Sequence, residues 1–333
     1  MSPAGRNCPL HYRYAPEALA GADALQVETL YVIGGLYGNV ESLRQVLAMK
    51  RDEEARSGAR VELLFNGDFN WLDVDAASFA EINETVLQHT ALLGNVEAEL
   101  GSADEGNGCG CNYPAYVDAA VVERSNAIMR RLYEQAQMYP ALSERVAALP
   151  KFRRVEVGGQ AIGVVHGDAE SLAGWGFAYE AMPPMRGEPK VQAIAAPSHL
   201  TSPARIAEYF RRAQLCAFAS THTGLPVMQD FEVDGKRCLI VNNGAAGLPN
   251  FTGKTFGLLT RISARAAAPA SSLYGTTLGG VRFDALPIRY SQAAWLARFL
   301  DNWPEGSAGH AAYFNRIAQG PEFSVRQACR TSH

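Results

Sequence analysis

The chain has 333 residues, of which 47% are apolar and 19% are charged, a composition typical of a folded globular protein rather than a disordered one. Thirty basic and 34 acidic residues leave a formal net charge of −4, and the basic residues are scattered, so no nucleic-acid partner is indicated. Residues 1–20 carry His11, Arg13 and Glu17 between short apolar pieces, which excludes the apolar core of a signal peptide or a spanning helix there. We therefore expect a cytoplasmic protein without a membrane partner.

Strand and helix patterns alternate through the first hundred residues. Residues 29–33, 61–65 and 91–93 are short apolar runs that predict strands, and each ends at glycine with asparagine or aspartate nearby. Apolar residues at helical spacing follow the first two strands, beginning near Asn39 and Phe79. This alternation predicts a largely parallel sheet with right-handed crossovers, buried on both faces.

The pattern changes after residue 100. A glycine-rich, acidic stretch at 101–112 predicts a loop, and residues 118–138 and 142–149 have the apolar spacing of amphipathic helices. The remainder is richer in strands, and Ser202 and Pro203 begin a further helix as cap and first residue. Strands are predicted at 152–157, 161–165, 215–219, 227–233 and 237–241.

We expect one domain over residues 1–333, because no stretch resembles a long polar linker. Its core is predicted at about 26–262, with a loop and helical insertion at 101–150 and a strand and helix extension at 263–333. Oligomeric state and protein partners stay open.

Six cysteines are too few for a disulfide scaffold in a chain of this length. Cys109 and Cys111 are separated by one glycine, which is too close for a comfortable mutual bridge, so reduced thiols are expected. This pair is either part of an inert loop or a functional pair of thiols, because reactivity depends on exposure and pKa.

Four polar motifs stand where predicted strands end. They are Gly67-Asp68, Gly94-Asn95, His166-Gly167-Asp168 and Thr221-His222-Thr223. Taken singly, each also suits an ordinary turn or a structural histidine. Because the carboxyl ends of parallel strands meet at one edge of a sheet, their joint presence favours a common site. One carboxylate, one amide oxygen and two imidazoles suit a divalent transition metal such as Mn, Fe or Zn.

In order and spacing these motifs resemble the calcineurin-like metallophosphoesterases, in particular the bacterial type whose asparagine motif lacks a following histidine. The resemblance covers roughly residues 32–250, including Leu225-Pro226 and the Asn-Gly-Ala-Ala-Gly-Leu-Pro run at 243–249. It implies an α/β fold, the four-layer αββα sandwich with mixed, largely parallel sheets and added helices.

The resemblance also separates the family's two metal sites, which share a bridging aspartate and a bridging hydroxide that attacks phosphorus. Counterparts of all ligands of the second metal are present, namely Asp68, Asn95, His166 and His222. The first metal's aspartate-x-histidine motif is matched by Gly35-Leu36-Tyr37, and its final histidine by Gly224. One divalent ion is therefore expected rather than two.

The activity that the resemblance implies is hydrolysis of phosphate monoesters or diesters. A metal-bound hydroxide held through Asp68, His166 and His222 would attack a small phosphorylated substrate. Further candidates for contacts with the substrate or the ligands are Tyr37, Asn39, Glu97 and Asp168, with His89 as another donor. Tyr37 alternatively packs into the vacated space.

Two alternatives stay open. The first metal site is rebuilt from other donors, for which Tyr37, Asp73, Glu97 and the Cys109-Cys111 pair are available. Alternatively, the protein is a catalytically inactive binding or partner module with a structural metal, because the aspartate-x-histidine motif is lost.

Overall fold

Two β-sheets packed face to face form the centre of the protein. The computed structural model describes residues 4–102, 105–184 and 200–331. In these residues one sheet has six strands in the order β11-β12-β10-β2-β3-β4, and the other has seven in the order β1-β5-β6-β7-β9-β8-β13. The six-stranded sheet consists of β2 (Thr29–Ile33), β3 (Val61–Asn66), β4 (Thr90–Leu92), β10 (Gly257–Ser263), β11 (Tyr274–Leu278) and β12 (Val281–Ile288). The seven-stranded sheet consists of β1 (Ala24–Val27), β5 (Phe152–Val157), β6 (Gln160–Val165), β7 (Ala217–Ser220), β8 (Val227–Val233), β9 (Lys236–Asn242) and β13 (Cys329–Arg330).

The strands that matter for the site are parallel. β2, β3 and β4 run in parallel in the first sheet, as do β6, β7 and β9 in the second. Antiparallel pairs, such as β10 with β2 and β5 with β6, complete both sheets. The helices are α1 (Glu17–Ala20), α2 (Val40–Ser57), α3 (Ala76–Val86), α4 (Asn95–Ser102), α5 (Ala119–Gln137), α6 (Pro140–Ala147), α7 (Pro203–Ala213), α8 (Gln292–Asn302), α9 (Ala308–Gln319) and α10 (Val325–Ala328).

Alternate residues of each strand face different layers. Leu30 and Val32 of β2 pack between the sheets, in one cluster with Val164 of β6. Tyr31 points the other way, into a cluster with Leu43 of α2. Because successive side chains of a strand point to opposite faces, both faces of β2 are buried. The sequence therefore reads as a continuous apolar run instead of an alternating one.

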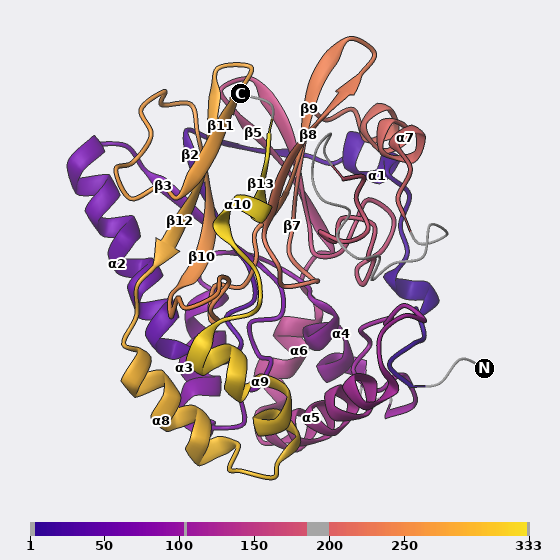
Figure 1. The fold of residues 1–333 in the computed structure, drawn as a ribbon, viewed down its shortest axis with the longest axis vertical. Helices are drawn as coiled ribbons and strands as arrows, with labels where there is room; N and C mark the ends of the chain where they lie inside the picture. Colours follow the sequence, from indigo (N-terminus) through magenta and orange to yellow (C-terminus); the bar gives the residue numbers. More distant parts are fainter. Residues whose placement is uncertain (1–3, 103–104, 185–199, 332–333) are drawn as a thin grey trace.

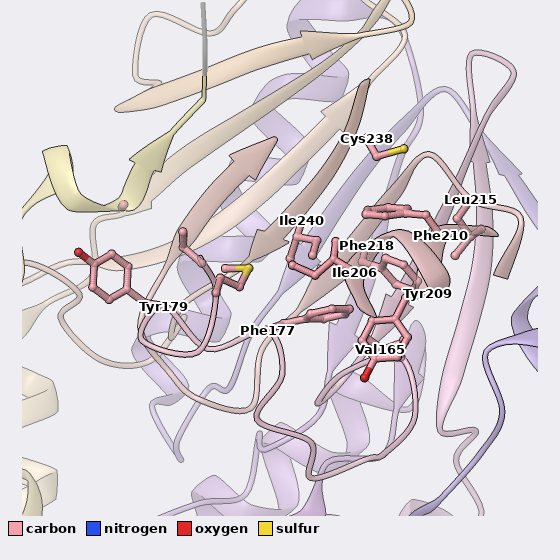
Figure 2. Packing of buried hydrophobic residues seen from close by; sticks show 14 of the residues in the cluster. Val165, Phe177, Tyr179, Ile206, Tyr209, Phe210, Leu215, Phe218, Cys238 and Ile240 are labelled. Atoms are coloured by element: carbon pink, nitrogen blue, oxygen red, sulfur yellow. The ribbon is translucent and has the colours of Figure 1, made fainter. Parts of the chain in front are cut away.

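Aromatic side chains join α7 to the outer face of the seven-stranded sheet (Figure 2). The ring of Phe218 on β7 lies 5.1 Å from that of Phe210 on α7 and 5.2 Å from that of Phe177, measured between centroids. Figure 1 shows α2 and α7 on opposite sides of the two sheets. The predicted αββα sandwich is confirmed.

Further helices gather at one end of the sheets, where α4, α5, α6, α8 and α9 lie together (Figure 1). Apolar residues of α4, α5, α8 and α9 belong to one cluster, which includes Ile128 and Leu132 of α5 and Trp295 and Phe299 of α8. This helical layer closes the end of the molecule that carries the candidate site. No helix in residues 4–102, 105–184 and 200–331 combines the length and apolar character needed to cross a membrane.

The sequence predicted β2 to β9, but it located no strand at β10 to β13 beyond expecting a strand and helix extension at 263–333. It also did not predict β1. This strand lies at the edge of the seven-stranded sheet, where it pairs only with β5, and its residues are partly exposed. A short edge strand with weak alternation gives little signal. The strand expected at 215–219 begins at Ala217, because Gln214 ends α7 in a left-handed conformation and Leu215 still belongs to the turn.

A buried ion pair links α2 to the six-stranded sheet and provides a test of the fold. Arg261 of β10 donates to Glu53 of α2 at 2.8 Å and lies 3.4 Å from Asp284 of β12. Replacing Arg261 with Met (Arg261→Met) leaves the buried Glu53 without its cation, so we expect the free energy of unfolding to fall by about 3–5 kcal/mol in urea denaturation.

Arg265→Met is the matched control, because Arg265 pairs with Glu28 at the surface. Its expected loss is below about 1 kcal/mol. Equal losses for the two variants would contradict the assigned role of Arg261.

Candidate metal site

Four polar side chains lie at the carboxyl ends of parallel strands. Asp68 follows β3, Asn95 follows β4, His166 follows β6 and His222 follows β7. One oxygen of Asp68 and one ring nitrogen each of His166 and His222 all lie within 4.8 Å of one another. His166 Nε2 is 3.3 Å from Asp68 Oδ1 and 3.3 Å from Asn95 Oδ1. The two sheets therefore bring all four side chains to one place.

Two glycines allow the ends of β3 and β4 to approach closely. Gly67 has a φ of +79°, and a Cβ there would lie 2.4 Å from the backbone nitrogen of Gly94. A Cβ at Gly94 would lie 2.3 Å from Asp68 Oδ1. Any larger residue at either position therefore pushes the two strand ends apart.

Glu97 of α4 holds this turn from inside the protein. It is buried, and its Oε2 accepts hydrogen bonds from the backbone N–H groups of Asp68 at 2.7 Å and Gly94 at 3.0 Å. Its Oε1 accepts from the backbone N–H of Asn70 at 3.1 Å. Burial, followed by the charge of Asp68, raises the pKa of Glu97 to about 7. Glu97 thus fixes the backbone that presents Asp68, which itself has a φ of +55°.

The orientation of His166 is set by a backbone carbonyl. Its Nδ1 lies 2.7 Å from the carbonyl oxygen of Asn66, which only accepts, so Nδ1 carries the hydrogen and Nε2 faces Asp68 and Asn95. Burial opposes protonation of His166, but the Asp68 carboxylate outweighs it and raises the pKa of the imidazole. Burial likewise acts to raise the pKa of Asp68, and the charge of His166 outweighs it and lowers that pKa. The cluster therefore stabilises positive charge at this position.

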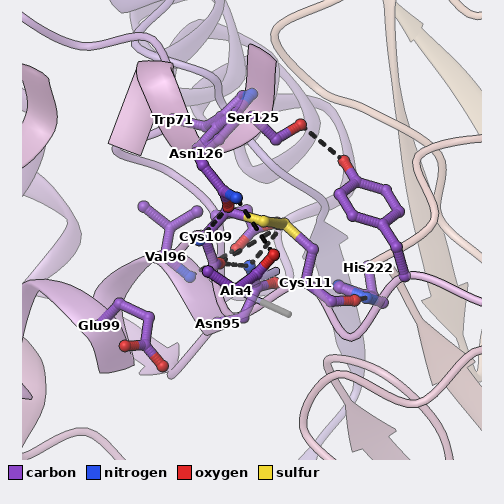
Figure 3. Close-up of a disulfide and its surroundings, with 12 residues drawn as sticks. Ala4, Trp71, Asn95, Val96, Glu99, Cys109, Cys111, Ser125, Asn126 and His222 are labelled. Atoms are coloured by element: carbon purple, nitrogen blue, oxygen red, sulfur yellow. Dashed lines mark hydrogen bonds between the residues drawn. A yellow bond between two sulfur atoms is a disulfide. The ribbon is translucent and has the colours of Figure 1, made fainter. Parts of the chain in front are cut away.

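The loop at 108–113 orients the other two side chains (Figure 3). The Cys111 carbonyl lies 3.1 Å from His222 Nε2 and accepts from the Trp175 indole N–H at 2.9 Å. The Asn95 amide donates to the Cys109 carbonyl at 2.8 Å, and its Oδ1 faces His166 Nε2. Two backbone carbonyls of one short loop therefore set the direction of both side chains.

His222 presents a nitrogen that has no partner. With Nε2 donating to a carbonyl, Nδ1 is the ring atom with a lone pair, and it is buried without a hydrogen bond to any described residue. Burial, followed by the neighbouring His166, lowers the pKa of His222 to about 4, so the ring is neutral at pH 7. A neutral imidazole with an unpaired, buried nitrogen has the properties of a metal ligand.

Cys109 and Cys111 form a disulfide, with Cα atoms 5.3 Å apart. The expectation of reduced thiols is therefore wrong for this pair. Gly110, with a φ of +62°, turns the backbone between them so that the two side chains meet. A pair of free thiols at the site has no support here, whereas Cys8, Cys216, Cys238 and Cys329 are free.

Tyr37 packs against Gly35 and Gly224, two positions that the resemblance matched to ligands of a first metal. A Cβ at Gly35 would lie 2.4 Å from the Tyr37 ring, and one at Gly224 would lie 3.2 Å from its hydroxyl. Tyr37 has a φ of +55°, which is unusual for a bulky residue and is held by the tight turn after β2. Burial, followed by the charge of Asp68, raises the pKa of Tyr37, so its hydroxyl is a neutral donor.

No second cluster replaces the first site within the described chain. Among its His, Cys, Asp and Glu side chains, those of Asp68, His166 and His222 form the one group of three that could hold a metal ion. Asp73 instead accepts a hydrogen bond from Ser78 at 2.5 Å.

Three other predicted neighbours lie outside the pocket that the site opens into. Asn39 caps α2 by accepting from the Ser42 N–H and also donates to the Gly247 carbonyl. Asp168 accepts three backbone N–H bonds and so shapes the loop that carries Trp175; the donors are Glu170, Ser171 and Gly176. His89 precedes β4, whereas the site lies beyond the other end of that strand.

The pocket beside the four side chains has a volume of about 140 Å³ and is lined on one side by Asp68, Asn95 and His222. Aromatic side chains form much of the remaining wall, and Arg316 of α9 completes it. The aromatic residues are Tyr37, Trp71, Tyr113, Trp175 and Tyr313. Apart from Tyr37, the sequence did not predict them, because they come from separate loops and α9 with no common spacing.

No protein-family model matches the chain, and no curated protein matches it in sequence. Solved structures do resemble it. The hypothetical protein PH1004 from Pyrococcus horikoshii OT3 gives a TM-score of 0.55 at 14% identity, covering 89% of this chain and 99% of that chain. A metallophosphoesterase from Sphaerobacter thermophilus gives 0.49 at 15% identity, with 90% and 100% covered. A predicted phosphoesterase from Streptococcus pneumoniae TIGR4 gives 0.36 at 11% identity, with 80% and 94% covered.

At these identities the likeness concerns the fold alone, and the two lower TM-scores add nothing to it. The chain therefore shares the fold of PH1004, and its two sheets with helices on their outer faces form the αββα sandwich that the sequence motifs implied.

The role of Glu97 is testable by Glu97→Gln, which keeps the shape of the side chain. One acceptor oxygen becomes an NH₂ group that faces backbone N–H donors, so charged hydrogen bonds to Asp68 and Gly94 or to Asn70 are lost. We expect the free energy of unfolding to fall by about 1.5–3 kcal/mol, measured by urea denaturation.

Glu84→Gln, at an exposed position of α3, serves as the control and is expected to change stability by less than about 0.5 kcal/mol. A Glu97→Gln protein as stable as this control would show that the three amide bonds do not hold the turn.

Proposed function

We propose that the protein is a metal-dependent hydrolase of phosphate esters that holds one divalent transition-metal ion, Mn, Fe or Zn, at Asp68, Asn95, His166 and His222. The observation that carries the proposal is the convergence of these four donors at the ends of strands from two different sheets. Its substrate is a small phosphorylated molecule, because the adjoining pocket has a volume of only about 140 Å³.

The donors fit such an ion in number and in chemistry. One carboxylate, one amide oxygen and two imidazoles are ligands that Mn, Fe and Zn accept. His222 Nδ1 has no hydrogen-bond partner among the described residues, and His166 Nε2 lies 3.3 Å from Asp68 Oδ1, so each neutral ring has a nitrogen available for a cation beside that carboxylate. Both rings also have a backbone carbonyl on their other nitrogen, which is the usual way that a ligand imidazole is held.

A divalent ion bound there supplies Lewis-acid chemistry, polarising a phosphoryl oxygen and activating water for hydrolysis. The chain's own residues do the rest. Asp68 contributes the negative charge that holds the cation, and Glu97 keeps the Asp68 backbone in place. The aromatic wall keeps bulk water from the reacting group, which strengthens every electrostatic interaction inside. The Tyr37 hydroxyl, neutral and at the pocket wall, is available to donate to the substrate.

A single ion is supported by what surrounds the site. Tyr37 lies where a side chain at position 35 would project, and its hydroxyl lies next to position 224. Both positions are glycines, so neither offers a ligand. A second ion therefore has no ligand side chain at either position.

The proposal is tested with purified protein and Mn²⁺ or Zn²⁺. At a metal concentration of 100 times Kd we expect the free energy of unfolding to rise by about 2.7 kcal/mol. Hydrolysis of p-nitrophenyl phosphate or bis(p-nitrophenyl) phosphate is expected to require the metal. His166→Ala is expected to lose both effects, and His89→Ala, which changes a histidine outside the pocket, to keep both.

The outcomes separate the two readings of the fold. If metal stabilises the wild type but neither ester is cleaved above the His166→Ala level, the enzyme is excluded and the inactive binding or partner module takes its place. If metal stabilises the wild type and His166→Ala equally, the metal does not bind at the proposed site.

A further inference from the structure

We propose that Arg316 of α9, which lines the same pocket as the metal ligands, binds the phosphoryl group of the substrate, and that this makes the protein selective for phosphate monoesters. The inference rests on the proposed function for its substrate, but anion binding by Arg316 is measurable without any hydrolysis.

Arg316 is held in the pocket wall by two backbone carbonyls. Its Nε donates to the Pro249 carbonyl at 3.0 Å, and its Nη2 donates to the Gly224 carbonyl at 2.7 Å. Its Nη1 has no hydrogen-bond partner among residues 4–102, 105–184 and 200–331, and no carboxylate there lies within ion-pair distance. The guanidinium is therefore fixed in direction and keeps an uncompensated charge.

The free nitrogen lies beside the vacated half of the site. A Cβ at Gly224 would lie 3.5 Å from Arg316 Nη1 and 3.2 Å from the Tyr37 hydroxyl. Arg316, Tyr37 and Asp68 all line the same pocket. A guanidinium and a phenol thus stand where the sequence lacks ligands for a second ion, and both are hydrogen-bond donors.

Arginine suits this position because its charge is permanent and its planar donors match the oxygens of a phosphate. Two bonds to carbonyls fix the group in advance, so little freedom is lost when an anion binds. Lysine would supply a charge but not the fixed fork.

The charge of the site favours a monoester. Among the groups that line the pocket or would bind the ion, a divalent ion, the Asp68 carboxylate and neutral ligands together carry +1, and Arg316 raises the total to +2; Glu97 lies behind Asp68 and does not line the pocket. A phosphate monoester carries a charge near −2 at pH 7, because its second pKa is about 6. A diester carries only −1, and the aromatic wall leaves little room for a second ester group in about 140 Å³.

The test uses inorganic phosphate as the probe, measured by isothermal titration calorimetry with metal-loaded and with metal-free protein. Arg316→Gln is expected to weaken phosphate binding about tenfold or more, the effect of losing a charged hydrogen bond. Metal binding and its stoichiometry are expected to stay unchanged. Arg316→Lys is expected to lie between the wild type and Arg316→Gln.

The control is Arg131→Gln. Arg131 of α5 also donates to a backbone carbonyl, that of Asn302, and stacks on Trp303, but it lies outside the pocket. This variant is expected to bind phosphate as the wild type does. In kinetics, Arg316→Gln is expected to raise KM for p-nitrophenyl phosphate far more than for bis(p-nitrophenyl) phosphate.

Two further experiments distinguish phosphate binding by Arg316 from a purely structural role. Added guanidinium ion is expected to restore phosphate binding to Arg316→Ala, which loss of packing would not allow. If the variants do not fold, the wild type still decides the question, since phosphate is expected to protect Arg316 from modification by phenylglyoxal. Modification of Arg316 at the same rate with and without phosphate would overturn the proposal.

Failure of this inference is distinct from failure of the proposed function. Unchanged phosphate affinity in a folded Arg316→Gln protein that still hydrolyses esters refutes the role of Arg316 alone. Arg316-dependent phosphate binding by a wild type without turnover refutes the hydrolase and leaves an anion-binding protein.

Discussion

The close approach of two strand ends at Gly67 and Gly94 is the constraint on which the site depends. Neither position has room for a Cβ, and the Glu97 carboxylate closes the gap by accepting backbone N–H bonds from Asp68 and Gly94. A buried carboxylate is costly unless its oxygens are satisfied, so the arrangement ties the stability of the turn to the direction of Asp68. The second sheet meets this point through His166, whose hydrogen bond to the Asn66 carbonyl bridges the two sheets.

The side chains around the site fall into two groups by their chemistry. Side chains on the strand ends offer lone pairs, whereas Tyr37 and Arg316 in the wall of the same pocket offer hydrogen-bond donors. A second metal ion would need ligands of its own. The Arg316 guanidinium, in contrast, is part of the chain and is held by two backbone carbonyls. Arg316 therefore brings positive charge to the pocket without any metal ion. The same wall also restricts the pocket, since Tyr37 occupies volume that ligands would otherwise need.

The sequence predicted the core of the fold and the four converging side chains for the same reason. Apolar runs such as 61–65 identify buried strands, and the residue that follows a parallel strand lies at a known edge of the sheet. It did not predict that Arg316 and Trp175 line the pocket. Their positions depend on how α9 and a long loop pack, and no local sequence pattern indicates that packing. The Cys109–Cys111 disulfide was not predicted, because the separation of the two cysteines by one residue indicated no mutual bridge. That prediction did not include the turn at Gly110, which brings their side chains together. The sequence suggested that Glu97 contacts either the substrate or the ligands, and its hydrogen bonds go to the backbone that carries Asp68.

The central claim is that one cation, and not two, is bound where the two sheets meet. Anomalous diffraction from crystals grown with Mn²⁺ or Zn²⁺ tests it most directly. The account predicts a single anomalous peak per chain, within about 2.0–2.3 Å of ligand atoms of Asp68, Asn95, His166 and His222. Two peaks close together, or one peak bonded to other residues, would contradict it.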